Sequence, residues 1–390
     1  MALVTWGRVW LATAVLVSSA AGCGTEDTET ARWRLDYVTD SRDAYVRHVV
    51  AVSPNEGWAV ATEKNGDGDS ADVLLHRDGA EWRPAPTPPA LNTYKGAELG
   101  TLAASGPDNV WQFGNLAPDG GVRDRQNGAV RWDGQRWSRT SVSFPVYDAV
   151  VLAPDNVWAL DASSAGPAAR HWDGTKWTEQ RWSPAEYYLD SLAATGPDDV
   201  WASGFHGDQA AIMHYDGKRW EPVDIPSIRP APAQKASIHD IFAVSRTNVW
   251  AFGQLTSAAG SPTTFAVNWN GSEWRKYADG CADPSARIRS QSGPRGTGDG
   301  AGGFVLSCAI GGVQHRSRDG NPTRIENPDP VAGRGSEATD QDRQQLFVLH
   351  DLTLVPGTRQ VQAVGAVGIA LAPGDTKFSR GVIASYTTGG

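Results

Sequence analysis

Cysteine is scarce in this sequence, with three residues among 390. Two of them, Cys281 and Cys308, have no histidine or further cysteine at metal-ligand spacing, so the sequence predicts no metal site and no cofactor. In an exported protein such a pair most simply forms a disulfide, and we predict a Cys281–Cys308 bridge. The alternative is a pair of buried free thiols.

Long apolar runs and clusters of cations are also missing. The apolar run near the N-terminus, Val9 to Val17, is far shorter than the roughly 20 residues that a membrane-spanning helix needs. The net charge of -9 and the pI of about 5.4 argue against nucleic-acid binding, which requires a basic surface. A hydrophobic content of 40% with a mean hydropathy of -0.39 predicts a soluble, globular chain, which we interpret as one folded domain.

Catalytic signatures are missing as well. The chain contains no Gly-x-Ser-x-Gly, His-Glu-x-x-His or Cys-His arrangement that would indicate a hydrolase. Arg47, Arg287 and Arg289 approach the predicted inner strands, as the arginines of a propeller sialidase would, but no Glu or Tyr accompanies them at a recurring position. These observations predict a non-catalytic protein.

The N-terminus predicts export. Arg8, the apolar run and the small residues after it have the order of a secretory signal. Ala20-Ala21-Gly22-Cys23 resembles a bacterial lipobox, in which the cysteine becomes lipidated, although Ala20 stands where leucine is commonest. We predict a lipoprotein signal peptide over residues 1–22, lipidation of Cys23 and a flexible tether over residues 23–31. Ordinary secretory cleavage nearby is the alternative.

Tryptophan is abundant, and it is placed in a repeat. A Val-Trp or Gly-Trp dipeptide followed by an Asp-Gly-x-x-Trp or similar motif occurs five times. The first tryptophans are Trp58, Trp111, Trp158, Trp201 and Trp250, and the second are Trp82, Trp137, Trp177, Trp220 and Trp274. The first set is spaced by 53, 47, 43 and 49 residues. Periods of about 40 to 50 residues built from short strands are typical of a β-propeller.

A turn motif organises each repeat. Asn270-Gly271, or an Asp-Gly dipeptide in the other repeats, lies between the third and fourth predicted strands. These dipeptides favour a type I′ turn with positive φ at both residues, so the two strands are predicted to be antiparallel neighbours. Four such strands make one blade, and the aromatic residues beside the turn are predicted to fill the space between blades.

The repeat continues in weaker form toward the C-terminus. Residues 304–325 predict a sixth blade without tryptophan, and residues 341–390 supply three strands of a seventh. The missing strand is predicted at Arg32–Tyr37, which reads like the strand after a hairpin turn. The predicted fold is therefore all-β: a seven-bladed β-propeller of four-stranded antiparallel blades over residues 32–390, closed by an N-terminal strand that completes the last blade.

The Asn-Val-Trp-Ala strand at residues 248–251, with the Trp-Asp-Gly-x-x-Trp motif of other repeats, resembles exported bacterial propeller lipoproteins. These are similar in outline to kelch, galactose-oxidase-like and Asp-box propellers. The resemblance covers residues 32–390 and implies the fold. The Gly-Gly pair of kelch repeats and the Asp-box spacing are missing here, so the resemblance implies no activity.

Polar residues recur where the predicted inner strands begin: His48, Asp148, Asp190, Asp240 and Asp351. Three of them lie ten residues before the second-strand tryptophan, and Asp190 lies eleven before it. We expect them to ring one mouth of the central channel, where they would bind a cation or a cationic or hydroxyl-rich ligand. The alternative, which we favour, is that the carboxylates accept hydrogen bonds from backbone amides of adjoining segments.

Two further segments have weaker motifs. The acidic run Asn65–Asp72 resembles a calcium loop, but Ser70 and His76 stand where Gly and Glu are required, which favours a surface turn. Gly293–Gly303 lacks the Gly-Lys-Ser/Thr ending of a phosphate loop, and we predict a flexible loop of the sixth blade.

The sequence predicts a lipid-anchored propeller on the extracytoplasmic face of the cell membrane. We expect a non-catalytic scaffold that binds a protein or a glycan of the cell envelope and no nucleic acid. The alternative is an extracytoplasmic glycan-acting hydrolase or lyase with its site at the channel mouth. The sequence leaves the oligomeric state open.

The anchor gives a direct test. If Cys23 is lipidated, the Cys23→Ala variant should move from the membrane fraction to the medium, because its only predicted membrane attachment is lost. Mass spectrometry of the unaltered protein should find no free thiol at this residue. Unchanged membrane retention of the variant would contradict the prediction.

Overall fold

The structure is a computed structural model, and residues Ala31–Gly390 form one compact unit in it. It describes residues 31–389 with the exception of 65–69, 87, 89–97, 117–125, 164–167, 183–185, 227, 229, 258–259, 280, 282–292, 309–311, 333–337, 341 and 373–374. The predicted signal peptide, Cys23, residues 24–30, Arg287 and Arg289 lie outside the described residues. Among the described residues there is no helix with the length and hydropathy of a membrane span.

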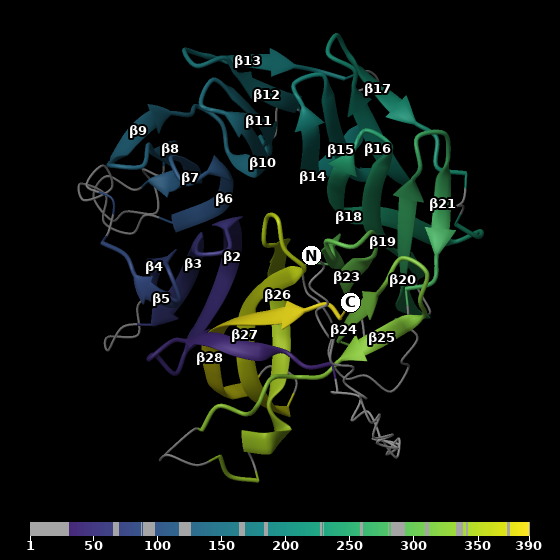
Figure 1. Cartoon of the computed structure of the whole chain (residues 1–390). Helices are drawn as coiled ribbons and strands as arrows, with labels where there is room; N and C mark the ends of the chain where they lie inside the picture. Colours follow the sequence, from purple (N-terminus) through teal and green to yellow (C-terminus); the bar gives the residue numbers. More distant parts are fainter. Residues whose placement is uncertain are drawn as a thin grey trace, which may run out of the picture. The chain divides into compact units, whose positions relative to one another are not determined.

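The chain folds into seven four-stranded antiparallel sheets, as predicted, and each sheet is one blade of a propeller (Figure 1). The first three blades comprise β2 (Ala44–Ser53), β3 (Glu56–Lys64), β4 (Ser70–Asp78) and β5 (Glu81–Pro84); β6 (Glu98–Gly106), β7 (Asn109–Leu116), β8 (Gln126–Trp132) and β9 (Trp137–Ser141); and β10 (Val146–Ala153), β11 (Asn156–Asp161), β12 (Ala168–Trp172) and β13 (Trp177–Gln180). The fourth and fifth comprise β14 (Tyr187–Gly196), β15 (Asp199–His206), β16 (Gln209–Tyr215) and β17 (Trp220–Val223); and β18 (Gln234–Ser245), β19 (Asn248–Ser257), β20 (Gly260–Trp269) and β21 (Trp274–Tyr277). The sixth comprises β22 (Arg295–Gly298), β23 (Phe304–Ser307), β24 (Val313–Arg316) and β25 (Pro322–Ile325).

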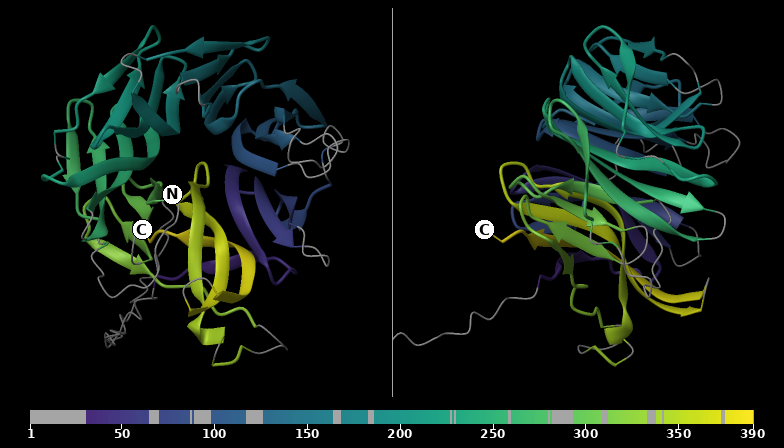
Figure 2. Two further views of the ribbon diagram at one scale, coloured as in Figure 1. Left: turned by 180° about the vertical axis from the view of Figure 1, so that it is seen from behind. Right: turned by 90° about the vertical axis from the view of Figure 1, so that its right-hand side faces the viewer.

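The seventh blade joins the two ends of the chain. It consists of β26 (Leu346–Leu354), β27 (Gln360–Ala372), β28 (Asp375–Thr387) and β1 (Arg34–Val38), in the order β1-β28-β27-β26. A short 3₁₀ turn at Asp342–Gln344 precedes β26. The first strand of each blade packs against the first strand of the next all round the ring, which Figure 2 shows from behind and from the side. The predicted closure by the N-terminal strand is confirmed.

Tryptophan packing joins neighbouring blades. In four successive pairs, the second-strand tryptophan of one blade lies against the two aromatic residues that flank the outer hairpin turn of the next. The contacts are Trp58 with Trp132 and Trp137, Trp111 with Trp172 and Trp177, Trp158 with Tyr215 and Trp220, and Trp201 with Trp269 and Trp274. Ring centroids in these contacts are 4.8 to 6.3 Å apart. Each such pair contributes about 0.5 to 1.5 kcal/mol beyond the burial of its surface.

The hairpin turns between third and fourth strands differ from the prediction. Positive φ occurs at the glycine alone, for example 91° at Gly217, and Ala233 is the one other residue type with positive φ in the described part of the chain. The turns are therefore not type I′. In the second to fifth blades the Asp or Asn side chain instead closes a longer loop: Oδ1 of Asp216 accepts hydrogen bonds from the amides of Lys218 and Arg219 at 2.9 and 3.0 Å. In the first blade Asp78 pairs with Glu81, so that turn is short. The predicted antiparallel pairing of the strands is nevertheless confirmed.

The sixth blade corrects one expectation and confirms another. Arg295–Gly298, in the predicted flexible loop, forms the inner strand β22. Its glycines allow close packing, since a Cβ on Gly296 would lie 2.4 Å from the Phe252 ring of the fifth blade. The predicted disulfide between Cys281 and Cys308 is present, with the two Cα atoms 5.5 Å apart. It joins the segment after β21 to the end of β23, and so links the fifth and sixth blades.

The closure gives a stability test. Trp33 is 2% exposed and packs edge-on against Phe347 and Tyr386 at 5.9 Å. Deletion of residues 32–40 should lower the thermal midpoint of the whole propeller, because it removes the β1–β28 ladder and this buried ring. Trp33→Ala alone should cost about 3 to 5 kcal/mol of unfolding free energy. Deletion of residues 24–30 is the control, and equal midpoints for the two deletions would contradict the closure.

Candidate functional site

The inner strands carry a bulge near their first residues, and this bulge places polar side chains at the channel. In β18, Ile238 pairs with Gly253 and Asp240 with Phe252, so His239 is the extra residue. The same irregularity precedes His48 in β2 and Asp351 in β26. A bulge turns side chains away from the regular alternation of the strand. It therefore brings residues far apart in the sequence to one ring of positions.

All five predicted site residues line one central cavity of about 420 Å³. Asp240 and Asp351 follow a bulge, and Asp148 lies within one. Asp190 is itself the bulge residue, because Leu189 pairs with Gly204 and Ser191 pairs with Ser203. This shift explains the spacing of eleven residues for Asp190, and Ser191 takes the position ten before Trp201.

Three of the carboxylates connect neighbouring blades through backbone amides. Oδ1 of Asp148 accepts from the amide of Ala149, and Oδ2 accepts from Leu192 of the next blade, both at 2.8 Å. Asp240 makes the same contacts to Ile241 and Gly296, at 3.0 and 2.8 Å. Both oxygens of each carboxylate thus have donors already.

Asp351 closes the series between the last blade and the first. Its Oδ1 accepts from Leu352 at 2.9 Å, and its Oδ2 accepts from Val49 of the first blade at 3.1 Å. His48 lies beside it, with Nδ1 3.8 Å from Oδ2. Asp148, Asp240 and Asp351 therefore make the amide contacts that the favoured alternative expects, and ligand binding by the five residues stays a prediction.

Asp190 is bonded differently. Its Oδ1 is inaccessible to solvent and has no hydrogen-bond partner among the described residues, and its Oδ2 lies 3.9 Å from Nδ1 of His239. The other ring nitrogen of His239 is bonded to the Ser237 hydroxyl at 2.8 Å. Asp190 thus differs from Asp148, Asp240 and Asp351, because the described residues give it no amide donor from a neighbouring blade.

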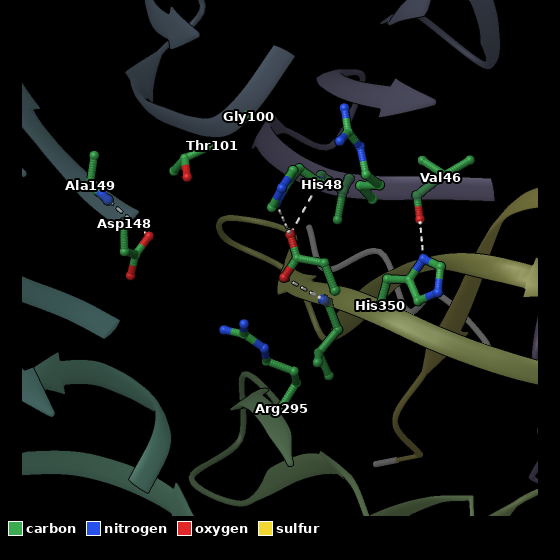
Figure 3. A network of polar contacts seen from close by, with 12 residues as sticks. Val46, His48, Gly100, Thr101, Asp148, Ala149, Arg295 and His350 are labelled. Atoms are coloured by element: carbon green, nitrogen blue, oxygen red, sulfur yellow. Dashed lines mark hydrogen bonds and ion pairs between the residues drawn. The ribbon is translucent and has the colours of Figure 1, made fainter. Parts of the chain in front are cut away.

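One guanidinium faces these carboxylates. Arg295 enters the cavity from β22, and its Nη1 donates to the carbonyl of His239 at 3.4 Å. Figure 3 shows Arg295, Asp148 and His48, from three different blades, directed toward the same space. Sequence reasoning missed Arg295 because it lies in a glycine-rich run with little strand propensity. The count of four strands per blade, which requires a strand before Phe304, was the available signal.

Burial dominates the electrostatics of the channel. It raises the pKa of Asp148 and of Asp240 to about 6, against the opposing effects of amide donors and Arg295. Burial, with the charges of Asp148 and Asp240, raises the pKa of Asp190 to about 7, although Arg295 opposes the shift. Burial alone would lower the pKa of Arg295, but the surrounding carboxylates outweigh it and raise that pKa. Burial lowers the pKa of His239 to about 4, so its imidazole is neutral near pH 7.

A second cavity, of about 390 Å³, adjoins the channel between the third and fourth blades. Three aromatic side chains line it: Tyr147 on β10, Tyr188 on β14 and Phe205 on β15. Tyr188 and Phe205 are stacked, with centroids 5.3 Å apart and ring planes at 14°. Asp190 and Tyr147 line both cavities. We call this second cavity the aromatic cleft.

The aromatic cleft was not predicted from the sequence. Tyr188 lies thirteen residues before Trp201, and Tyr45 lies thirteen before Trp58, so tyrosine does recur at one position of the inner strands. Asp161, also in the cleft, is buried and accepts two hydrogen bonds from the Arg170 guanidinium at 2.7 and 2.9 Å.

The acidic run Asn65–Asp72 is described only from Ser70 onward. Asp72 lies within β4, and its Oδ1 accepts from the Thr62 hydroxyl at 2.7 Å. Its Oδ2 accepts from the amide of Leu99 in the second blade at 2.8 Å and from the Arg47 guanidinium at 2.7 Å. This carboxylate therefore joins two blades. In the described part of the chain, no three His, Cys, Asp or Glu side chains are grouped to hold a metal ion.

Comparisons with known proteins leave the chain without a named family. No family model matches it, and no curated protein matches it. Among solved structures, it is similar to a GH74 xyloglucanase from Xanthomonas campestris, at 13% identity and a TM-score of 0.44, over 87% of this chain and 59% of the xyloglucanase. It is also similar to a protein of unknown function from Dyadobacter fermentans, at 13% identity and a TM-score of 0.44, over 92% of this chain and 98% of that one. The chain thus spans less than two thirds of the xyloglucanase.

The pKa of Asp190 predicts a pH-dependent stability. Because its folded value of about 7 lies above the unfolded value of about 3.9, the folded state holds this proton more tightly. The stabilisation is complete below pH 4 and is lost as the pH rises through 7. Asp190→Asn should therefore unfold at a higher temperature than the unaltered protein at pH 8, by roughly 1 to 3 kcal/mol of unfolding free energy, but not at pH 4.

Asp319→Asn, at an exposed turn, is the matched control and should show no such pH-dependent difference. A constant difference between Asp190→Asn and the unaltered protein from pH 4 to pH 8 would show that Asp190 titrates normally.

Proposed function

We propose that the protein is a non-catalytic glycan-binding propeller, held by a lipid on Cys23 at the extracytoplasmic face of the membrane, and that the aromatic cleft holds one sugar ring. The observation that carries the proposal is where the exposed apolar side chains lie. Five large ones are exposed in the described residues: Tyr45, Tyr147, Tyr188, Phe205 and Val244. Three of these, Tyr147, Tyr188 and Phe205, line the aromatic cleft.

The shape and chemistry of the cleft suit a pyranose. Tyr147 and Tyr188 are each 57% exposed, stand on adjacent blades and line the same cleft. The apolar C–H face of a sugar packs on such faces, while its hydroxyls need acceptors, which Asp190 and the tyrosine hydroxyls supply. The volume of the cleft lies within the roughly 300 to 1,000 Å³ of small-molecule sites. A protein partner would instead require exposed apolar side chains spread over a broad, flat surface.

The alternative of a glycan-acting enzyme has one supporting observation, the raised pKa of Asp190, which suits a general acid. Glycoside hydrolysis ordinarily requires a second carboxylate at the scissile bond. Asp148 and Asp240 are the nearest candidates by pKa, but both oxygens of each already accept backbone hydrogen bonds. This bonding favours binding over catalysis.

Substitution of the cleft tyrosines tests the proposal. On an array of neutral, acidic and amino-sugar oligosaccharides, the protein should bind a subset of glycans. Tyr147→Ala and Tyr188→Ala should each weaken that binding about 3- to 10-fold, because each removes one stacking face.

Tyr45→Ala is the matched control, since Tyr45 occupies the same strand position as Tyr188 but lies outside the cleft. The proposal would be contradicted if the protein binds no glycan on the array, or if both cleft variants bind as tightly as the unaltered protein. Cleavage of the bound glycan, abolished by Asp148→Asn or Asp240→Asn, would instead establish the enzyme.

A further inference from the structure

Carboxylates outnumber guanidinium groups around the channel in the described part of the chain. Four carboxylates, those of Asp148, Asp190, Asp240 and Asp351, share the channel there with one guanidinium, that of Arg295. The other titratable groups that face them are His48, His239 and His350 in the channel and Tyr147, Tyr188 and the Arg170-bound Asp161 in the cleft. Burial lowers the pKa of His239 and of His350, so these two rings add no positive charge near pH 7.

Asp190 lines both cavities and differs from the other three carboxylates. Both oxygens of Asp148, Asp240 and Asp351 accept from backbone amides, one of them in the next blade, whereas the described residues supply no such donor to Asp190. A buried carboxylate that lacks donors is less stable in its ionised form than one that is hydrogen-bonded. Oδ1 of Asp190 is inaccessible, but the side chain is 25% exposed, so a cationic donor in the cleft can approach the carboxylate from its accessible side and offset its charge.

We infer that the sugar held in the aromatic cleft is an amino sugar, whose protonated primary amine binds the Asp190 carboxylate. This inference rests on the glycan-binding function proposed above and specifies the chemistry of its ligand. The aromatic faces of Tyr147 and Tyr188 add to the selection, because a cation close to an aromatic face is stabilised further. An N-acetylated sugar has no charge to offer and a single N–H in place of three.

Proton balance follows from the same contact. Near pH 6.5 much of Asp190 is protonated in the free protein, because its pKa is about 7. An ammonium requires the ionised carboxylate, so binding releases the Asp190 proton to solvent. Affinity should therefore pass through a maximum near neutral pH. Below it the Asp190 carboxyl is protonated, and above it the amine of glucosamine, which is much more acidic than that of lysine, loses its proton.

Calorimetric titration distinguishes the amine from the sugar ring. The probes are β-1,4-linked tetramers of glucosamine, N-acetylglucosamine and glucose. At pH 7.0 the glucosamine tetramer should bind at least tenfold more tightly than the other two, and Asp190→Asn should abolish that preference. At pH 6.5, titrations in buffers with different ionisation enthalpies should reveal the released proton with the unaltered protein and not with Asp190→Asn. Asp319→Asn is the matched charge control, and thermal unfolding checks that each variant is folded.

The outcomes distinguish a failure of the amino-sugar inference from a failure of the glycan-binding function on which it rests. Equal binding of the three tetramers, lost in Tyr188→Ala, would overturn the inference and leave the glycan-binding function intact. Preferential binding of the glucosamine tetramer that Asp190→Asn retains would also overturn it, since the contact would then be general charge attraction. If the protein binds neither any tetramer nor any glycan on the array, both the amino-sugar inference and the glycan-binding function are overturned.

Discussion

The contact of one blade's tryptophan with the next blade's hairpin is the interaction on which the ring depends. A blade is a small sheet with two apolar faces and cannot bury both by itself, so each needs a neighbour on either side. Placement of a second-strand indole against the paired aromatics of the next turn, as with Trp158 against Tyr215 and Trp220, fixes both the spacing and the order of the blades. The sixth blade has no tryptophan, and there Phe304 contacts Trp250 of the fifth blade. The Cys281–Cys308 disulfide adds a covalent link between these two blades.

The channel carboxylates have a structural role, which limits how they could bind a ligand. Asp148, Asp240 and Asp351 reach across to the first strand of the next blade, so the inner ring is connected by charge-assisted hydrogen bonds as well as by apolar packing. Their burial makes the channel costly to ionise, and Arg295 offsets only part of that cost. Asp190, displaced by one residue onto the bulge, is the departure from this pattern. A departure from a repeated structural pattern is where a site with another purpose is expected.

Much of the fold could be predicted from the sequence because the blades repeat the same sequence motif. The spacing of Trp58, Trp111 and their successors gives the blade period, and the unmatched strand after Trp33 gives the closure. The turn geometry was not predictable from Asp-Gly alone, since the Asp216 carboxylate stabilises a longer loop than the dipeptide favours. The inner strand at Arg295 was missed because its glycines are required by the neighbouring Phe252 ring, which is a tertiary constraint. The aromatic cleft was missed for the same reason: its residues come from two blades and four strands.

The seam in the seventh blade sets the order in which the protein can be completed during synthesis. Arg34 and Ser385, which are partners across the β1–β28 ladder, are separated by 351 residues, whereas every other blade is assembled from strands that follow one another in the chain. β1 leaves the ribosome before every other strand of the ring and is thus the last to find its partner, and contacts of such high sequence separation form slowly. Throughout translation β1 is an unpaired strand edge, the kind of surface that promotes association between chains. The ring becomes a closed structure only after β28 has been added.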